Sequence, residues 1–97
     1  IAYEPVWAIG TGDYAKPDEA AEAVDYIRSY VRDVFGEKAA AGVRILYGGS
    51  VTPEVIHGFL EVRGVDGFLV GGASLNYHSF AGIVLAANTW QREKGGD

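Results

Sequence analysis

The residues best suited to chemistry in this chain follow three separate apolar runs. They are Glu4, Gly48-Gly49-Ser50 and Gly71-Gly72-Ala73-Ser74. In parallel α/β folds the carboxyl ends of the strands form the ligand-binding face, so three such ends in succession predict one shared site. Glycines there let backbone N–H groups approach an anion closely, and a helix beginning just beyond Gly72 would direct its positive end at the same ligand. The pattern favours a phosphate, although a tight turn after a strand also accounts for either glycine pair taken alone.

Glu4 is the candidate base. A lone carboxylate at a strand end also serves as a salt-bridge partner or a helix cap, and both alternatives stay open from position alone. The side chains of Val6, Trp7 and Ile9 follow on a glycine-containing loop that is able to cover the carboxylate. Apolar cover excludes water and makes a carboxylate a stronger base, as proton abstraction next to a carbonyl requires.

The segment from Pro5 to Ala15 has the composition of a lid. It carries proline at one end, apolar residues in the middle, and Gly10 and Gly12 where the backbone must swing. Such segments close over substrates and open to release products. Permanent packing of Trp7 and Ile9 is the alternative interpretation.

Short apolar runs alternate with longer periodic segments, which predicts βα units feeding a parallel sheet. The expected strands are the run that ends at Glu4-Pro5, then Val43–Tyr47, then Val65–Val70. Proline keeps the residue before it out of the α region, so Glu4 is expected in extended backbone. The expected helices begin at Pro17 and end at Gly36, begin at Pro53 after a Thr52 cap, and run through Phe80 to Ala87.

The apolar face of the first helix is expected to be buried, because Ala20, Val24 and Val31 recur at helical spacing. Arg28 and Arg32 complement the negative end of that helix, and its charges are expected mostly on solvated surface.

Composition excludes several classes of protein. The 97 residues are 48% hydrophobic and carry a net charge of −5, with no basic stripe for nucleic acid or anionic lipid. No cysteine is present, so disulfides, thiolate metal sites and thiol nucleophiles are excluded. No apolar run approaches the roughly 20 residues that span a membrane. Because the sequence starts abruptly at Ile1 and contains no Met, we expect it to be part of a longer chain.

Three segments carry a resemblance to a known family. Ala2 to Gly12 (AYEPVWAIGTG) resembles the signature of triosephosphate isomerases, and Tyr47–Val51 and Gly67–Leu75 resemble that family's phosphate-binding segments in the same order. The resemblance covers essentially the whole chain. It implies an α/β fold in which residues 1–97 form one partial domain, the last three βα units of a (β/α)₈ barrel of about 250 residues, with three parallel strands each followed by a helix.

The resemblance also implies roles for matching residues. Glu4 would shuttle a proton between adjacent carbons of a phosphorylated triose through an enediol intermediate, interconverting dihydroxyacetone phosphate and glyceraldehyde 3-phosphate. The substrate phosphate would be bound by Gly10, Ser50, Gly71 and Gly72. The lid and its hinge would comprise Pro5, Val6, Trp7, Ala8, Ile9 and Thr11, and Tyr47 and Ser50 would receive the closed lid by hydrogen bonds. The family is itself an established example of a carboxylate base paired with a neutral histidine behind a closing loop.

Other implications concern the whole enzyme. It would be a cytoplasmic isomerase of glycolysis and gluconeogenesis, without cofactor or metal, and a homodimer whose interface lies mostly outside this chain. Its active-site lysine, electrophilic histidine and an asparagine come from earlier strands, and neither His57 nor His78 lies in a matching motif. Those two histidines are expected at the surface or near helix ends. The second hinge departs from the Lys-Thr-Ala of many relatives, because Asp13-Tyr14-Ala15 stands there.

The sequence leaves two alternatives open. The chain by itself is expected to be inactive, a barrel piece that at most binds phosphate or associates with a complementary piece. Another phosphate-binding barrel enzyme, such as a lyase or synthase of aromatic amino-acid metabolism, would explain Gly71-Gly72 but not the segment from Tyr3 to Gly12.

Overall fold

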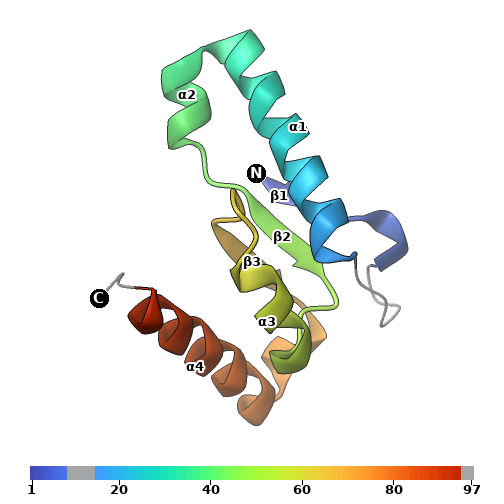
Figure 1. Ribbon diagram of the computed structural model, residues 1–97. Coiled ribbons are helices and arrows are strands. Elements are labelled where there is room, and N and C mark those ends of the chain that lie inside the picture. Colours follow the sequence, from blue (N-terminus) through green and yellow to red (C-terminus); the bar gives the residue numbers. More distant parts are fainter. Residues whose placement is uncertain (9–14, 95–97) are drawn as a thin grey trace.

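The computed structural model describes residues 1–8 and 15–94, and Figure 1 traces their path. This part of the chain alternates strands with helices, as the sequence pattern predicts. In chain order the elements are β1 (Ala2–Tyr3), the 3₁₀ helix η1 (Val6–Ala8), α1 (Pro17–Phe35), α2 (Glu37–Gly42), β2 (Leu46–Gly49), α3 (Pro53–Leu60), β3 (Gly67–Val70), the 3₁₀ helix η2 (Gly72–Leu75) and α4 (Tyr77–Glu93).

The strands form one parallel sheet in the order β1-β2-β3. Tyr3 lies opposite Tyr47 in the first pair, and Tyr47 lies opposite Phe68 in the second. The α/β class and the parallel arrangement of the three strands are therefore confirmed. Since all three strands point the same way, their carboxyl ends lie at one edge of the sheet.

The predicted bounds of the second strand are wrong at both ends. The strand begins at Leu46 rather than Val43, because the backbone N–H of Ile45 donates to the Asp66 carboxylate, 2.9 Å away, and not to a neighbouring strand. It continues through Gly48 and Gly49, which pair with Leu69 and Val70 of β3. The two glycines are thus strand residues, and the tight-turn interpretation does not apply to them.

Helix α1 follows the prediction closely. Its first helical residue is Pro17, its buried face carries Ala20, Val24 and Val31, and the N–H of Gly36 donates to Arg32 just past its end. The short helix α2 was not predicted. Its sequence EKAAAG contains three consecutive alanines, the residue with the highest helix propensity, and they continue the helical path after Gly36.

Aromatic rings of β2, β3 and α3 form the centre of the core. Tyr47 and Phe59 stack with ring centroids 4.4 Å apart, and Phe68 meets Phe59 edge-on at 6.5 Å. Ile56 and Ile83 complete this core from α3 and α4. The core therefore ties α3 and α4 to one side of the sheet and places Tyr47 directly beneath the strand ends.

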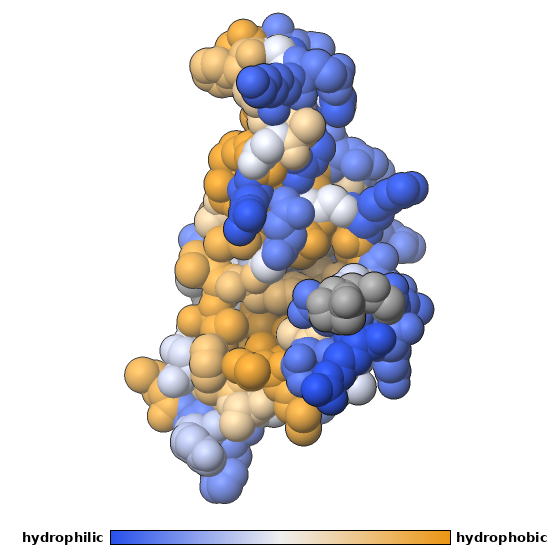
Figure 2. Space-filling view, turned by 90° about the vertical axis from the view of Figure 1, so that its left-hand side faces the viewer, coloured by the Kyte–Doolittle hydropathy of each residue, from blue (hydrophilic) through white to orange (hydrophobic). Residues whose placement is uncertain are grey.

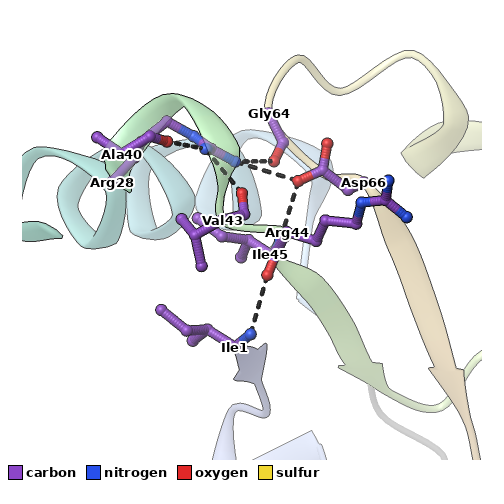
Figure 3. Close-up of polar contacts among 8 residues, drawn as sticks. All are labelled: Ile1, Arg28, Ala40, Val43, Arg44, Ile45, Gly64 and Asp66. Carbon is purple, nitrogen blue, oxygen red and sulfur yellow. Dashed lines mark hydrogen bonds and ion pairs between the residues drawn. The ribbon is translucent and has the colours of Figure 1, made fainter. Parts of the chain in front are cut away.

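Arg28 joins α1 to the amino ends of the strands (Figure 3). Its guanidinium donates to the carbonyls of Ala40, Val43 and Gly64 and to the carboxylate of Asp66, with a 3.1 Å ion pair to the last. Only 19% of the Arg28 side chain is exposed. Arg28 is thus an exception to the expectation that the charges of this helix lie mostly on solvated surface, because three carbonyls and a carboxylate converge on it.

The outer strands β1 and β3 each pair on one side only within the described residues. Hydrophobic residues gather over the left and centre of one face of the molecule, and hydrophilic residues lie mainly along its right side (Figure 2). Large apolar side chains on β3 and α4, among them Leu69, Val84 and Leu85, are exposed. The sheet therefore presents open edges and apolar surface of the kind that further strands and helices cover.

Candidate active site

A cleft of about 640 Å³ lies at the carboxyl edge of the sheet. It receives residues from all three strand ends, so the three segments singled out in the sequence meet at one place. The lining residues are Glu4, Gly49, Ser50, Val51, Thr52, Val55, Leu69, Val70, Gly71, Gly72 and Ala73. Glycines, a hydroxyl and a carboxylate thus line one volume, and the glycines are of the kind that suits a small anionic ligand.

Glu4 follows β1 directly and is exposed to solvent at the cleft. Pro5 behind it is buried, which fixes where the chain leaves the strand. The side chains of Val6 and Trp7 are 83% and 52% exposed. Val6 and Trp7 therefore do not bury Glu4 here, and Ile9, which was also expected to cover it, lies outside the described residues.

Tyr47 lies beneath the cleft and is fully buried. Its hydroxyl oxygen accepts a hydrogen bond from the backbone N–H of Ala15 at 3.0 Å. Burial raises the pKa of the Tyr47 hydroxyl, while the hydrogen bond from Ala15 acts in the opposite direction. A Cβ atom at Gly49 would lie 2.8 Å from this hydroxyl oxygen, so the missing side chain of Gly49 makes room for it.

Ser50 makes a second contact of the same kind. Its Oγ donates to the carbonyl of Ala8 at 3.4 Å. Ala8 and Ala15 flank the segment 9–14, so the end of β2 contacts the chain on both sides of that segment through Ser50 and Tyr47. These are the two residues expected to receive a lid.

Gly71 and Gly72 lie at the end of β3, where the short helix η2 begins. The carbonyl of Gly71 accepts hydrogen bonds from both the backbone N–H and the Oγ of Ser74, at 2.9 and 2.6 Å. The predicted long helix does not start there. Helix α4 begins at Tyr77 instead, because the side chain of Asn76 accepts from the N–H of Ser79 and caps it.

Several predicted site residues lie outside the described part of the chain. They are Ile9, Gly10, Thr11 and Gly12, with Asp13 and Tyr14 of the second hinge. His57 is exposed in the last turn of α3, and His78 is exposed on α4 with its ring 5.5 Å from that of Tyr77. Neither histidine lines the cleft.

Sequence reasoning did not include Val55 and Leu69 among the cleft residues. Leu69 is the neighbour of Phe68 in β3, and successive side chains of a strand point to opposite faces. With Phe68 assigned to the core, this alternation already directs Leu69 to the other face. No comparable sequence signal places Val55 at the cleft, because its position in the sequence indicates only another apolar residue of α3.

Metal-binding clusters and membrane-spanning helices are both absent from residues 1–8 and 15–94. In that range no three acidic or histidine side chains come together as a metal site would require. No helix there is both long enough and apolar enough to cross a membrane.

Comparison with known proteins identifies the group to which this fold and cleft correspond. The sequence profile described as triosephosphate isomerase matches residues 1–87. The chain belongs to the triosephosphate isomerase family. Its α/β sheet is accordingly a portion of that family's (β/α)₈ barrel.

Individual relatives agree. Triosephosphate isomerases from Syntrophotalea carbinolica and Citrifermentans bemidjiense are each 56% identical over 84 residues, which cover 87% of this chain and 33% and 34% of those relatives. The protein of the same name from Trichlorobacter lovleyi is 55% identical over 84 residues, again 87% of this chain and 34% of the relative. The chain thus spans about a third of the length of the curated relatives it matches.

Proposed function

We propose that this chain supplies the base and part of the phosphate site of a triosephosphate isomerase, which interconverts dihydroxyacetone phosphate and glyceraldehyde 3-phosphate. The observation that carries the proposal is the cleft that Glu4, Gly71 and Gly72 line together. The cleft brings a carboxylate together with strand-end glycines of the kind that suit a phosphate. The chain also belongs to the triosephosphate isomerase family.

Glu4 acts as the general base. It removes a proton from the carbon next to the carbonyl of the ketose while the carbonyl oxygen gains a proton, which gives an enediol. Reprotonation at the former carbonyl carbon, with loss of the proton from the other hydroxyl, then gives the aldose. Bond order is redistributed without net oxidation, so the reaction needs no redox cofactor. A carboxylate and a phosphate site in the same cleft meet the positional requirement for such a transfer.

The phosphate is held by backbone N–H groups near Gly71 and Gly72, with Ser50 and Gly10 contributing. A Cβ at Gly71 or Gly72 would meet nothing within 4 Å, so both residues have open space beside them, and both line the cleft. Tyr47 and Ser50 hold a lid, with a hinge at Pro5-Val6-Trp7, by the contacts to Ala15 and Ala8.

Complete activity requires the rest of a family barrel. The electrophilic histidine and the lysine that such an enzyme uses lie on earlier strands, and the homodimer contacts lie mostly there too. The whole enzyme works in the cytoplasm in glycolysis and gluconeogenesis. The chain alone is inactive and serves at most as a phosphate-binding or complementing piece, an alternative that the open edges of the three-stranded sheet favour.

The test uses a hybrid enzyme in which this chain replaces the matching third of the Syntrophotalea carbinolica relative. We expect the hybrid enzyme to isomerise triose phosphates and the chain of 97 residues alone to show no rate above buffer. Inorganic phosphate should inhibit the hybrid enzyme competitively. An inactive but folded hybrid enzyme, or the lack of competition by phosphate, would refute the proposal.

A further inference from the structure

Gly48 lies beside Glu4 in the sheet, at a distance that leaves no room for a side chain. A Cβ atom built on Gly48 would lie 2.7 Å from Cγ of Glu4 and 2.9 Å from its Oε2. Both distances are below any that real Cβ atoms show with such neighbours. The volume that a residue larger than glycine would need is therefore occupied by the Glu4 side chain.

The backbone of Gly48 does not itself demand glycine. Among the described residues, positive φ angles occur only at Gly36 and Gly64. Gly48 is a regular residue of the central strand β2, opposite Leu69 of β3. Its requirement for glycine therefore arises from the neighbouring side chain and not from a turn or from left-handed backbone.

Gly48 therefore differs from Gly71 and Gly72 in what surrounds it. A Cβ at Gly71 or Gly72 would meet no atom of the protein within 4 Å, whereas a Cβ at Gly48 would meet the stem and the carboxylate of Glu4. Gly71 and Gly72 thus have open space beside them. Gly48 faces the reacting group itself.

We propose that Gly48 is a positioning residue for the Glu4 carboxylate: its missing side chain leaves the space in which Glu4 lies against β2, the position from which the base acts. This inference rests on the proposed function of Glu4 for its catalytic consequence, but its steric part stands independently. It assigns to Gly48 a role separate from phosphate binding and from lid contacts.

The side chain that moves in a Gly48→Ala variant is that of Glu4. The backbone of Gly48 is buried and paired within the central strand, so it resists displacement. Glu4 is exposed, so its side chain can rotate away into solvent. The fold should survive, with the carboxylate displaced, and a shift of about 1 Å in a catalytic group costs roughly 10²-fold in rate.

The experiment measures kcat, KM and phosphate inhibition for the Gly48→Ala variant of the hybrid enzyme. We expect kcat to fall about 10²-fold, with the inhibition constant of inorganic phosphate unchanged. Gly42→Ala is the matched control, because its Cβ, unlike that of Gly48, would meet nothing within 4 Å, and it lies at the end of α2, outside the cleft lining. The control should keep the parent values. A Gly48→Ala variant with the parent kcat would overturn the inference.

A double-mutant cycle with Glu4→Ala distinguishes positioning from a general structural effect. In the Glu4→Ala background, Gly48→Ala should lower neither the residual rate nor the melting temperature, because the clashing atoms are gone. If Gly48→Ala alone fails to fold, adding Glu4→Ala should restore the melting temperature to that of Glu4→Ala. An equal loss in both backgrounds would overturn the inference. This stability comparison can be measured even in an inactive hybrid enzyme. Failure of the proposed function can therefore be distinguished from failure of the inference about Gly48.

Discussion

At the residue scale, the side chain of Glu4 occupies the space that a side chain at Gly48 would need. The proposed chemistry depends on Gly48 leaving that space to the carboxylate. The proposed base has one carboxylate and a fixed starting point after Tyr3, so its reach is set by the length of its side chain. A shorter side chain with the same carboxylate changes where the base lies without changing its chemical identity.

Glu4→Asp in the hybrid enzyme should lower kcat by about 10²-fold, because the carboxylate is withdrawn by one methylene from the substrate carbon. Inhibition by inorganic phosphate should be unchanged, since the glycines after β3 are not altered. Steady-state kinetics with a phosphate inhibition series provide the measurement. Parallel losses in phosphate affinity and kcat would argue against the assigned role.

Tyr47 links the cleft to stability at alkaline pH. Burial raises the pKa of its hydroxyl, so the neutral form is favoured in the folded protein. The unfolded chain ionises this group near pH 10, so its contribution is fully present below that pH and is lost as the pH rises through the raised pKa of the folded state. Tyr47→Phe should therefore show a smaller decrease in the free energy of unfolding above about pH 10 than the parent.

The same variant should be less stable at neutral pH. Removal of the hydroxyl leaves the N–H of buried Ala15 without its acceptor, which costs about 1–3 kcal/mol. Denaturant titrations of the hybrid enzyme at neutral and alkaline pH measure both effects. Identical pH dependence in the two proteins would contradict the assigned environment of Tyr47.

Position after a strand was the informative signal for individual residues. It predicted that Glu4, Ser50 and Gly71-Gly72 would lie together, and the cleft contains all of them. The relation between Glu4 and Gly48 was not predicted, although it follows from the register in which Tyr3 faces Tyr47. Apolar runs do not specify register across strands that are far apart in the sequence, so this contact required the structure.

At the element scale, Arg28 connects α1, the end of α2 and the loop before β3. Replacement by methionine keeps the length of the stem but leaves three carbonyls and the Asp66 carboxylate without this donor. Arg28→Met in the hybrid enzyme should therefore lower the free energy of unfolding by about 1–3 kcal/mol, as measured in urea.

Arg32→Met is the matched control on the same helix. Arg32 pairs with Glu37 at 2.8 Å, but the two side chains are 41% and 77% exposed. Exposed pairs of this kind contribute about 0–1 kcal/mol. Equal destabilisation by the two substitutions would contradict the role assigned to Arg28.

Helix caps and apolar periodicity predicted α1 and α3 with their first residues, because Pro17 and the Thr52-Pro53 pair carry local signals. The start of β2 and the helix α2 were not predicted. The start of β2 depends on Asp66, which accepts from Ile45 across 21 residues of sequence, and α2 rests on alanine propensity without a side-chain cap. Local sequence therefore specified where helices begin better than where strands begin.

At the scale of the whole molecule, the open edges of β1 and β3 dominate the behaviour of the chain alone. Unpaired strand edges invite pairing with other copies, and exposed Leu69, Val84 and Leu85 add apolar surface beside one of them. The chain of 97 residues should therefore self-associate at micromolar concentration. Size-exclusion chromatography with light scattering measures this. A stable, monodisperse monomer would contradict the account of the open edges.

Proton transfer by Glu4 is the central claim, and deuterium incorporation tests it most directly. The hybrid enzyme converts dihydroxyacetone phosphate in D₂O, and NMR follows the label in product and remaining substrate. We expect deuterium on the carbons between which the proton moves, because a carboxylate that holds the proton exchanges it with solvent. The label and the turnover should both be lost in Glu4→Gln. Turnover without any deuterium in product or substrate, or full turnover by Glu4→Gln, would contradict the account.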